Sequence, residues 1–374
     1  MARLGDICDV RRGTSITRKK TKPGNIPVVA GGLSSPYTHS EANRPANTVT
    51  VSGSGMHAGF VNFHKSPIYA SDCTTVIPKD PKKLLPVFVY RFLQSQQTHI
   101  YENLKRGAAQ PHVYPRDLAE LTIHLPSVSE QENTVKTLDK IFVEIAAATA
   151  SIEKNAANVH EIFESELNRV LRKKSSTKTT LGELCEFRRG LTYTKQDEVP
   201  TSKNAVLRAN NITVETGEIN FDEVRFISDD IEIPSSKKVA PGCLLICTAS
   251  GSKGHLGKTG LIDSELDYAF GGFMGLLVPS SQVLPKFLFW LTRSRFYREF
   301  VSGLSDGTNI NNLKWSQLSE LPVLLPPLAE QESIITMLDK SAASSRALVG
   351  IYGQKINALA ELKKSLLGEA FAGG

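Results

Sequence analysis

Two long segments of the chain, 127–174 and 328–374, repeat apolar side chains at every third or fourth position and contain no proline. Pro126 and Pro326 stand just before these segments, and acidic residues fill each first turn, where the helix dipole favours negative charge. The spacing lasts about four heptads, so it predicts two long helices that form a coiled-coil seam. Two ordinary long helices in separate cores remain the alternative. The predicted seam positions are Leu138, Ile141, Ile145, Ala148, Ile152, Asn155, Val159 and Ile162 in the first segment, and Ile334, Leu338, Ser341, Ser345, Leu348, Tyr352, Lys355, Leu359, Leu362 and Leu366 in the second.

The remaining segments alternate short strand-like runs with helical spacing, which predicts mixed α/β domains. Clusters of glycine, serine and proline separate these runs. The polar stretch 172–180 has no periodic face and is predicted to be the linker. The predicted strands cover 48–53, 74–78, 121–126, 244–249, 272–279 and 321–326, and the predicted helices cover 85–96 and 284–300.

An internal repeat organises the whole chain. LGDICDVRRGTSIT at 4–17 returns as LGELCEFRRGLTYT at 181–194, and LPSVSEQENTVKTLDKI at 125–141 returns as LPPLAEQESIITMLDKS at 325–341. Between these anchors the likeness is faint, although Ser52-Gly53-Ser54 can be laid over Ser250-Gly251-Ser252. A duplicated frame that holds two divergent inserts suits a molecule that does one job on two different targets.

The composition places the chain among globular proteins. Its 374 residues are 40% hydrophobic and 22% charged, which allows two domains and excludes wholesale disorder. No apolar stretch is long enough to span a bilayer and the start of the chain has no signal-peptide pattern, so a cytoplasmic protein without a membrane is expected. Five scattered cysteines offer no zinc-ligand spacing.

The net charge of +6 is concentrated at one end. Residues 1–124 hold 16 Lys and Arg against 8 Asp and Glu, whereas residues 175–324 hold 16 against 17. A basic domain attracts polyanions over about a Debye length, and nucleic acid is the commonest polyanion in a cytoplasm.

No catalytic or metal-binding constellation is predicted. SKGHLGKT at 252–259 resembles a phosphate loop, but Ser252 stands where that pattern requires glycine. The dispersed histidines are expected on surfaces or loops. The chain also lacks an Asn-Pro-Pro-Tyr-like tetrapeptide, the mark of an amino-methyltransferase.

Loops rich in Gly, Ser, Asn, Gln and Arg fit DNA recognition better, because Arg reads guanine, and Asn or Gln reads adenine. For any single residue an uninvolved surface loop is an equal alternative, so the prediction is stronger for the loops than for their residues. The candidate DNA-binding residues are Arg11, Arg12, Thr14, Lys19, Ser52, Ser54, His57, Arg106, Gln110 and His112 in the first half, and Arg188, Arg189, Arg208, Asn210, Ser250, Ser252, Lys253, His255, Asn309 and Asn311 in the second.

The whole pattern resembles the specificity subunit of type I restriction-modification enzymes. Both variable parts begin with Leu-Gly-Asp/Glu-Ile/Leu and end in Leu-Pro, Glu-Gln-Glu and a long helix. The resemblance implies an α/β (α+β) fold in which two long antiparallel helices join two target-recognition domains in a circular pseudo-twofold arrangement. The implied divisions are 1–125 (first target-recognition domain), 126–174 (central helix), 175–325 (linker and second target-recognition domain) and 326–374 (distal helix).

The same resemblance implies a non-catalytic subunit that binds double-stranded DNA, with each domain reading one half of a bipartite, asymmetric site. The coiled coil would set the spacer and dock two methylation subunits, and restriction subunits would join them. No cofactor is expected in this chain, whereas S-adenosylmethionine, ATP and Mg²⁺ are expected on the partner subunits. A self-sufficient DNA enzyme and a non-DNA scaffold built on the coiled coil are the two other classes considered.

Overall fold

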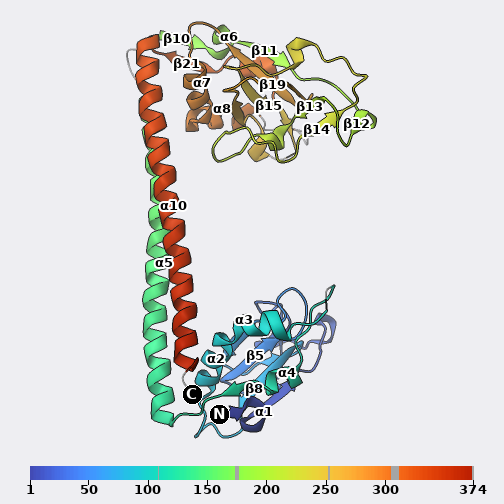
Figure 1. The fold of residues 1–374 in the computed structure, drawn as a ribbon, viewed down its shortest axis with the longest axis vertical. Coiled ribbons are helices and arrows are strands. Elements are labelled where there is room, and N and C mark those ends of the chain that lie inside the picture. The colour runs from blue at the N-terminus through green and yellow to red at the C-terminus, as the bar shows by residue number, and fades with distance from the viewer. Residues whose placement is uncertain (108, 173–176, 252, 305–310, 373–374) are drawn as a thin grey trace. The chain divides into compact units, whose positions relative to one another are not determined.

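The computed structural model describes residues 1–374 except 108, 173–176, 252, 305–310 and 373–374; the side chains of Lys253 and Asn311 are also not described. The chain divides into two compact units, one formed by Met1–Lys154 with Tyr352–Gly374 and the other by Asn155–Ile351. Each unit holds one globular α/β domain and part of both long helices, which are labelled α5 and α10 in Figure 1.

The first globular domain is built on an antiparallel sheet in the order β2-β8-β5-β6, beside a smaller sheet in the order β4-β3-β7. Every residue of β5 is buried, because neighbouring strands flank it and α2 packs on the sheet. The elements in chain order are β1 (Ala2–Arg3), α1 (Leu4–Ile7), β2 (Cys8–Arg12), η1 (Arg18–Lys20), β3 (Ile26–Val29), β4 (Thr38–His39), β5 (Thr48–Ser52), β6 (Val61–His64), β7 (Tyr69–Ala70), β8 (Cys73–Pro78), α2 (Pro86–Ser95), α3 (Gln97–His99), η2 (Ile100–Leu104), α4 (Pro115–Ala119) and β9 (Thr122–Ile123).

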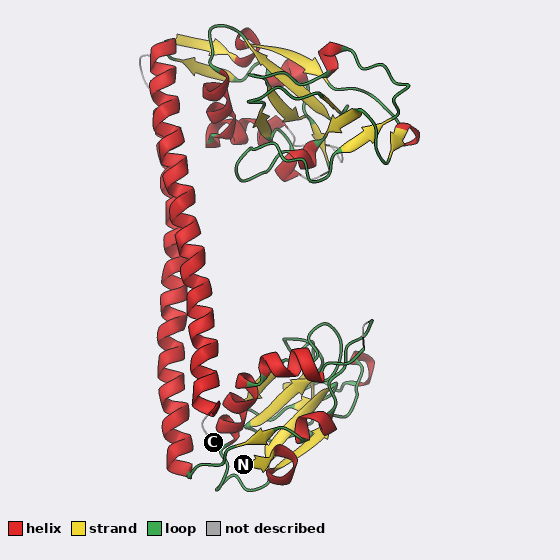
Figure 2. Cartoon of the chain, in the orientation of Figure 1, coloured by secondary structure: helices red, strands yellow, loops and turns green. Residues whose placement is uncertain are grey.

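The second globular domain repeats this plan with a sheet in the order β11-β19-β15-β17 and a second sheet in the order β12-β14-β13-β18 (Figure 2). The elements in chain order are β10 (Thr177–Thr180), α6 (Leu181–Leu184), β11 (Cys185–Arg189), η3 (Lys195–Asp197), β12 (Glu198–Val199), β13 (Asn204–Leu207), η4 (Ala209–Asn211), β14 (Arg225–Ile227), η5 (Ser235–Lys237), β15 (Leu244–Cys247), β16 (Ala249–Ser250), η6 (Lys253–His255), β17 (Thr259–Leu261), β18 (Tyr268–Phe270), β19 (Met274–Pro279), α7 (Pro285–Arg293), α8 (Arg295–Leu304), β20 (Asn311–Asn312), α9 (Trp315–Leu318) and β21 (Pro322–Leu325).

Backbone hydrogen bonds show which residues of the two domains are equivalent. The Gly53 amide donates to the Asp72 carbonyl at 3.1 Å, and the Thr248 amide donates to the Phe273 carbonyl at 2.9 Å. Gly53 therefore corresponds to Thr248, and the expected match of Gly53 with Gly251 is wrong. The reason is that the second domain carries additional residues between β13 and β15, including β14, which shift the register of everything that follows.

The repeated Arg-Arg-Gly motif marks a close backbone crossing in both domains. A Cβ atom on Gly13 would lie 2.3 Å from the Ser71 carbonyl oxygen, and one on Gly190 would lie 2.0 Å from the Gly271 carbonyl oxygen. Any larger residue would overlap main-chain atoms that cannot rotate away. The glycine is therefore required by packing, and the crossing fixes the end of β2 and of β11.

The long helices α5 (Val128–Val170) and α10 (Leu328–Ala372) join the two domains and are in contact. In the first unit the Lys363 ammonium lies 5.0 Å from the centre of the Phe142 ring, and Val135 shares a core with Phe371. In the second unit the Ser341 hydroxyl donates to Glu166 at 2.5 Å. Residue numbers fall along α10 as they rise along α5, so the helices run antiparallel, as predicted.

Thirteen of the eighteen predicted seam positions are buried or half-buried, and five are exposed. Leu138 and Leu338 are buried, whereas Asn155 and Lys355 are exposed and Ile162 is 68% exposed. Leu348 and Leu362 are also exposed; the neighbours Ala156, Phe163 and Ile356 are covered instead. An α-helix drifts by about 20° per heptad relative to a strict seven-residue repeat, so its covered stripe moves by one position over this length.

A buried glutamine ties each long helix to its globular domain. Gln131 is fully buried, and its oxygen accepts from the Leu85 amide at 2.9 Å while its nitrogen donates to the carbonyls of Lys83 and Pro126. Gln331 repeats all three hydrogen bonds with Leu284, Gln282 and Pro326 at 2.8–2.9 Å. The recurring Glu-Gln-Glu motif is thus the joint between domain and helix.

Two predicted segments need correction. The helix expected over 284–300 breaks at Ser294, which adopts an extended conformation and accepts a hydrogen bond from the Tyr297 amide, so α8 starts anew with a serine cap. The linker expected over 172–180 ends earlier, because Thr177–Thr180 form β10, which pairs antiparallel with β21. Residues 173–176 of that stretch lie outside the described residues.

The described part of the chain has neither a membrane-spanning helix nor a metal centre. No helix there is long and apolar enough to cross a bilayer, and no group of His, Cys, Asp and Glu side chains there is arranged to hold a metal ion. The five cysteines are buried and free, and burial raises the pKa of the Cys8, Cys73 and Cys185 thiols to about 12.

Replacing the buried glutamine of the second joint tests its role. Gln331→Met should lower the free energy of unfolding of the second domain by about 2–4 kcal/mol, because an amide and two carbonyls lose their partner. Both tryptophans, Trp290 and Trp315, lie in this domain, so urea unfolding followed by tryptophan fluorescence measures it. The matched control Glu332→Met, one residue on and exposed, should change stability by less than about 0.5 kcal/mol. Equal effects of both substitutions would contradict the claim that the hydrogen bonds of Gln331 stabilise this domain.

Replacing the glycine of the crossing tests the second constraint. Gly190→Ala should destabilise the same domain by about 2–3 kcal/mol, since the added Cβ would overlap the Gly271 carbonyl. Gly251→Ala is the control, because a Cβ there meets nothing within 4 Å. The measurement is again urea unfolding by fluorescence, and an unchanged Gly190→Ala midpoint would show that the backbone yields at the crossing.

Candidate nucleic-acid interface

In the first domain three loops converge at the end of β2. The Thr14 amide donates to the Ala70 carbonyl at 2.9 Å, and the Val113 amide donates to the Gly53 carbonyl at 3.1 Å. His112 forms an isolated β-bridge with Ser54. Main-chain hydrogen bonds therefore fix the loops that begin at residues 13, 53 and 105 against one another, and their side chains form one surface.

The Asp72 carboxylate lies at the centre of this surface. Its oxygens accept from the Arg12 guanidinium at 2.9 Å and from the Ser54 hydroxyl. Burial raises the pKa of the Asp72 carboxyl, but hydrogen bonds from Ser54 and Arg12 outweigh this effect, together with the charges of Arg12 and His112. The pKa therefore falls below its usual value. The carboxylate stays ionised and holds Arg12 in one orientation, while half of the Arg12 side chain remains exposed.

The other candidates of the first domain are less closely grouped. Arg106 pairs with Asp117 at 3.1 Å and bridges His112 through the backbone, and Gln110 is exposed beside it. Arg11 pairs with Asp9 at 2.9 Å, and the pleat of β2 turns it to the face opposite Arg12. The remaining positions are Thr14 and Lys19, which are exposed, His57, which is half-buried in the loop after β5, and Ser52, which is buried within β5 and lies apart from the surface.

In the second domain the equivalent surface contains two adjoining hollows. One of about 440 Å³ is lined by Arg189, Asn312, Lys314 and Trp315, and one of about 620 Å³ is lined by residues that include Arg208. Gly272 and Met274 line both hollows. Cationic, amide and aromatic side chains therefore line the same part of this surface.

The second-domain candidates differ in how far their side chains are already engaged. Arg188 donates two hydrogen bonds to Glu186, which raises the pKa of its guanidinium, and the Asn210 amide donates to Glu223. The Arg208 Nε and the His255 Nδ1 are buried without a partner among the described residues. Ser250 pairs with Asn311 through the backbone of β16 and β20, and Lys253 lies in η6. Ser252 and Asn309 lie outside the described residues.

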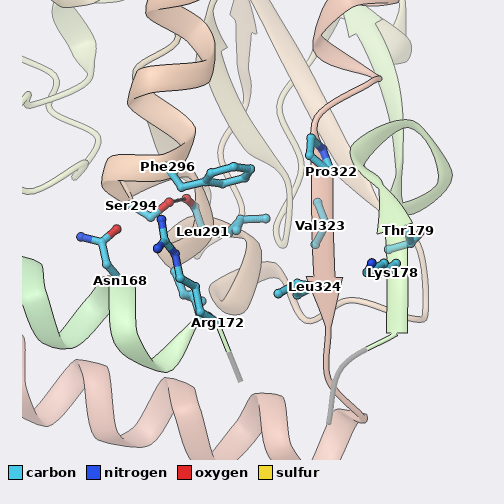
Figure 3. A pocket seen from close by; sticks show the side chains of 11 residues that line it. Asn168, Arg172, Lys178, Thr179, Leu291, Ser294, Phe296, Pro322, Val323 and Leu324 are labelled. Atoms are coloured by element: carbon cyan, nitrogen blue, oxygen red, sulfur yellow. Dashed lines mark hydrogen bonds between the residues drawn. The ribbon is translucent and has the colours of Figure 1, made fainter. Parts of the chain in front are cut away.

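The second unit also has an apolar hollow of about 470 Å³, lined by residues of α5, β10, α7, α8 and β21 (Figure 3). Leu291, Phe296 and Val323 line it together with the stem of Arg172 at the end of α5. None of the candidate DNA-binding residues lines it.

Sequence reasoning missed Asp72, Phe273 and Asn312. Basic and amide residues are the usual base readers, so a carboxylate and an aromatic ring did not fit that pattern; Asn312 is one position beyond the candidate Asn311. The recurrence of Tyr-Ala at 69–70 and 268–269, just before Asp72 and Phe273, was the available signal. The signal is obscured because the second domain has two more residues between the Tyr-Ala pair and the equivalent turn position.

Comparison with known proteins places the fold and the repeat in a family. The chain matches the family described as type I restriction modification DNA specificity domain over residues 1–154 and 173–348. It is 17% identical to a chain from a study of complex assembly and conformational transition of the type I restriction-modification system (TM-score 0.76, covering 99% of this chain and 96% of that one). It is 16% identical to the HsdS subunit from Thermoanaerobacter tengcongensis (TM-score 0.59, covering 100% and 96%). These two likenesses show the fold alone.

Three specificity subunits of type I restriction enzymes are similar in sequence. EcoKI from Escherichia coli (strain K12) is 32% identical over 188 residues, which is 50% of this chain and 40% of that protein. StySPI from Salmonella potsdam is 31% identical over 200 residues (53% and 42%), and EcoDI from Escherichia coli is 23% identical over 360 residues (87% and 78%). The match thus spans less than half the length of the first two relatives. Because the family match covers most of the chain, the protein belongs to the DNA specificity family of type I restriction-modification systems.

Proposed function

We propose that the chain is the non-catalytic subunit that recognises DNA sequence in a type I restriction-modification complex. The observation that carries the proposal is that both domains hold the same backbone frame and present different side chains on it. Arg12 and Arg189 occupy equivalent positions in their own domains, and the loops beside them share almost no sequence. Two different reading surfaces on one repeated support suit a bipartite, asymmetric site on double-stranded DNA.

The two domains contribute unequally to attraction. Residues 1–124 carry a strong excess of positive charge, and the second domain is nearly neutral. Phosphate contacts supply affinity and base contacts supply specificity. The first domain therefore supplies more of the salt-dependent affinity, and the second relies more on contacts with bases.

Methylation and cleavage belong to partner subunits in this proposal. Two methylation subunits dock on the frame of α5 and α10, and restriction subunits join them. S-adenosylmethionine, ATP and Mg²⁺ act on those partners, in the cytoplasm where DNA is accessible. The family match and the resemblance of the whole repeated pattern support this assignment.

The helices α5 and α10 are proposed to set the unread spacer between the half-sites. The end of α10 packs into the first domain, where Phe371 lies 5.0 Å from Phe88, and its start is tied to the second domain by Gln331. The α5 helix is likewise tied to the first domain by Gln131 and to the second by the ion pair of Glu164 with Arg298. A change in spacing requires both of them to change together.

Exchange of one domain tests independent reading. Replacing residues 1–124 with those of a relative should alter one half of the methylated motif and leave the other half unchanged. The measurement is methylome sequencing of a host that expresses the chain with its methylation subunits. The chain purified alone should transfer no methyl group from S-adenosylmethionine to DNA. A motif changed in both halves, or methylation by the isolated chain, would contradict the proposal.

Lengthening both helices tests the spacer. Four residues inserted after Asn155 in α5 and four after Ile351 in α10 add about 6 Å, close to two base-pair steps of about 3.4 Å each. The methylated motif should keep both halves and gain one or two unread base pairs. The same four residues inserted after Ser35, in an exposed loop of the first domain, should leave the spacer as it was. An unchanged spacer in an active, lengthened complex would show that α5 and α10 do not set the spacer length.

A further inference from the structure

One turn of the backbone structure that the two domains share carries a charged side chain, Asp72, in the first domain and an apolar one, Phe273, in the second. The carbonyls of Asp72 and Phe273 accept the same backbone hydrogen bond, from Gly53 and Thr248 respectively. The next residue after each begins the central strand β8 or β19, and its carbonyl holds the amide of Gly13 or Gly190. The backbone position is thus equivalent, although one side chain is a carboxylate and the other is a phenyl ring.

In the first domain the carboxylate acts on an arginine. Asp72 accepts one hydrogen bond from Arg12 and a second from Ser54, so its own position is fixed from two sides. The guanidinium has five N–H donors, and the one given to Asp72 leaves others free to meet a base. The Arg12 side chain is 51% exposed, so the pair faces solvent. A surface ion pair of this kind adds little stability, and its main effect is to restrict the orientation of Arg12.

In the second domain the Phe273 ring is itself exposed to solvent. Phe273 is 73% exposed, yet its carbonyl accepts hydrogen bonds from the Thr248 amide at 2.9 Å, the Thr248 hydroxyl at 3.0 Å and the Ala249 amide at 3.2 Å. The main chain is therefore fixed while the side chain has no apolar cover. Among the described residues no carboxylate lies within ion-pair distance of Arg189, the counterpart of Arg12.

We infer that this turn is a specificity-determining position in both domains: Asp72 positions Arg12 to read a guanine in one half-site, and Phe273 contacts a base directly in the other. The inference rests on the proposed function and deepens it. A guanidinium held in one plane matches the two acceptors of guanine in the major groove, and an exposed ring offers apolar contact to a base edge.

The test is selection of duplexes from a randomised library by the full chain in complex with its methylation subunits. Asp72→Asn should reduce the preference for guanine at one base pair of one half-site by about tenfold, with the other half-site unchanged. Arg12→Ala should relax the same base pair, and the double variant should show no further loss, because the two residues act as one unit. Asp72→Glu, which keeps the charge, should restore part of the preference.

Phe273→Ala should relax one base pair of the opposite half-site by a similar factor of about ten. Two matched controls should leave the selected motif unchanged. Asp9→Asn removes the carboxylate from the neighbouring Arg11 pair, which faces the other way, and Phe221→Ala removes a second exposed ring of the same domain, 46% exposed beside Tyr268.

The outcomes separate the inference from the proposed function. A wild-type complex that selects no motif would overturn the function and the inference with it. A wild-type motif that Asp72→Asn or Phe273→Ala leaves intact would overturn the inference alone. Relaxation of different base pairs by Asp72→Asn and Arg12→Ala would also overturn it, because the carboxylate would not be acting through Arg12. The half-site read by the unaltered domain reports in the same experiment that each variant is folded.

Discussion

The crossing of two backbone segments at Gly13, and again at Gly190, is the constraint on which both candidate DNA-binding surfaces depend. The absence of a side chain lets the strand end pass within contact distance of a carbonyl. That close approach fixes the direction in which Arg12 and Arg189 leave the sheet, and neighbouring hydrogen bonds lock the adjacent loops to the same point. Because the support is made from main-chain groups, the side chains on it are free to differ, as they do at Asp72 and Phe273.

A second set of buried contacts attaches the long helices to the globular domains in a fixed orientation. Gln131 and Gln331 each satisfy three main-chain groups at the start of a long helix, so each helix leaves its domain in a fixed way. Phe371 then packs on Phe88 and Phe92, which returns the end of α10 to the first domain. These joints connect each globular domain to the long helices through buried main-chain hydrogen bonds and aromatic contacts.

Much of this fold could be predicted because the repeated residues are the ones that the shared backbone structure of the two domains requires. Leucine, glycine and glutamine recur where burial, close approach and hydrogen bonding leave no choice, and the long helices follow from their apolar spacing. Five predicted seam positions, Asn155 and Ile162 among them, are exposed, because a strict seven-residue count ignores helical drift. The twenty candidate DNA-binding residues stay predictions, and Asp72 escaped notice because its partners Arg12 and Ser54 are 60 and 18 residues away.

The central claim is that equivalent surfaces of the two domains meet different halves of one DNA site. A photo-crosslinking amino acid placed at Met56 or at Phe273, which are 83% and 73% exposed, would report it directly in the complex with methylation subunits. The crosslinked nucleotides can be mapped on a duplex that carries the methylated motif. The account predicts that the two positions crosslink to opposite halves, separated by unread base pairs. Crosslinks from both positions to the same half would contradict it.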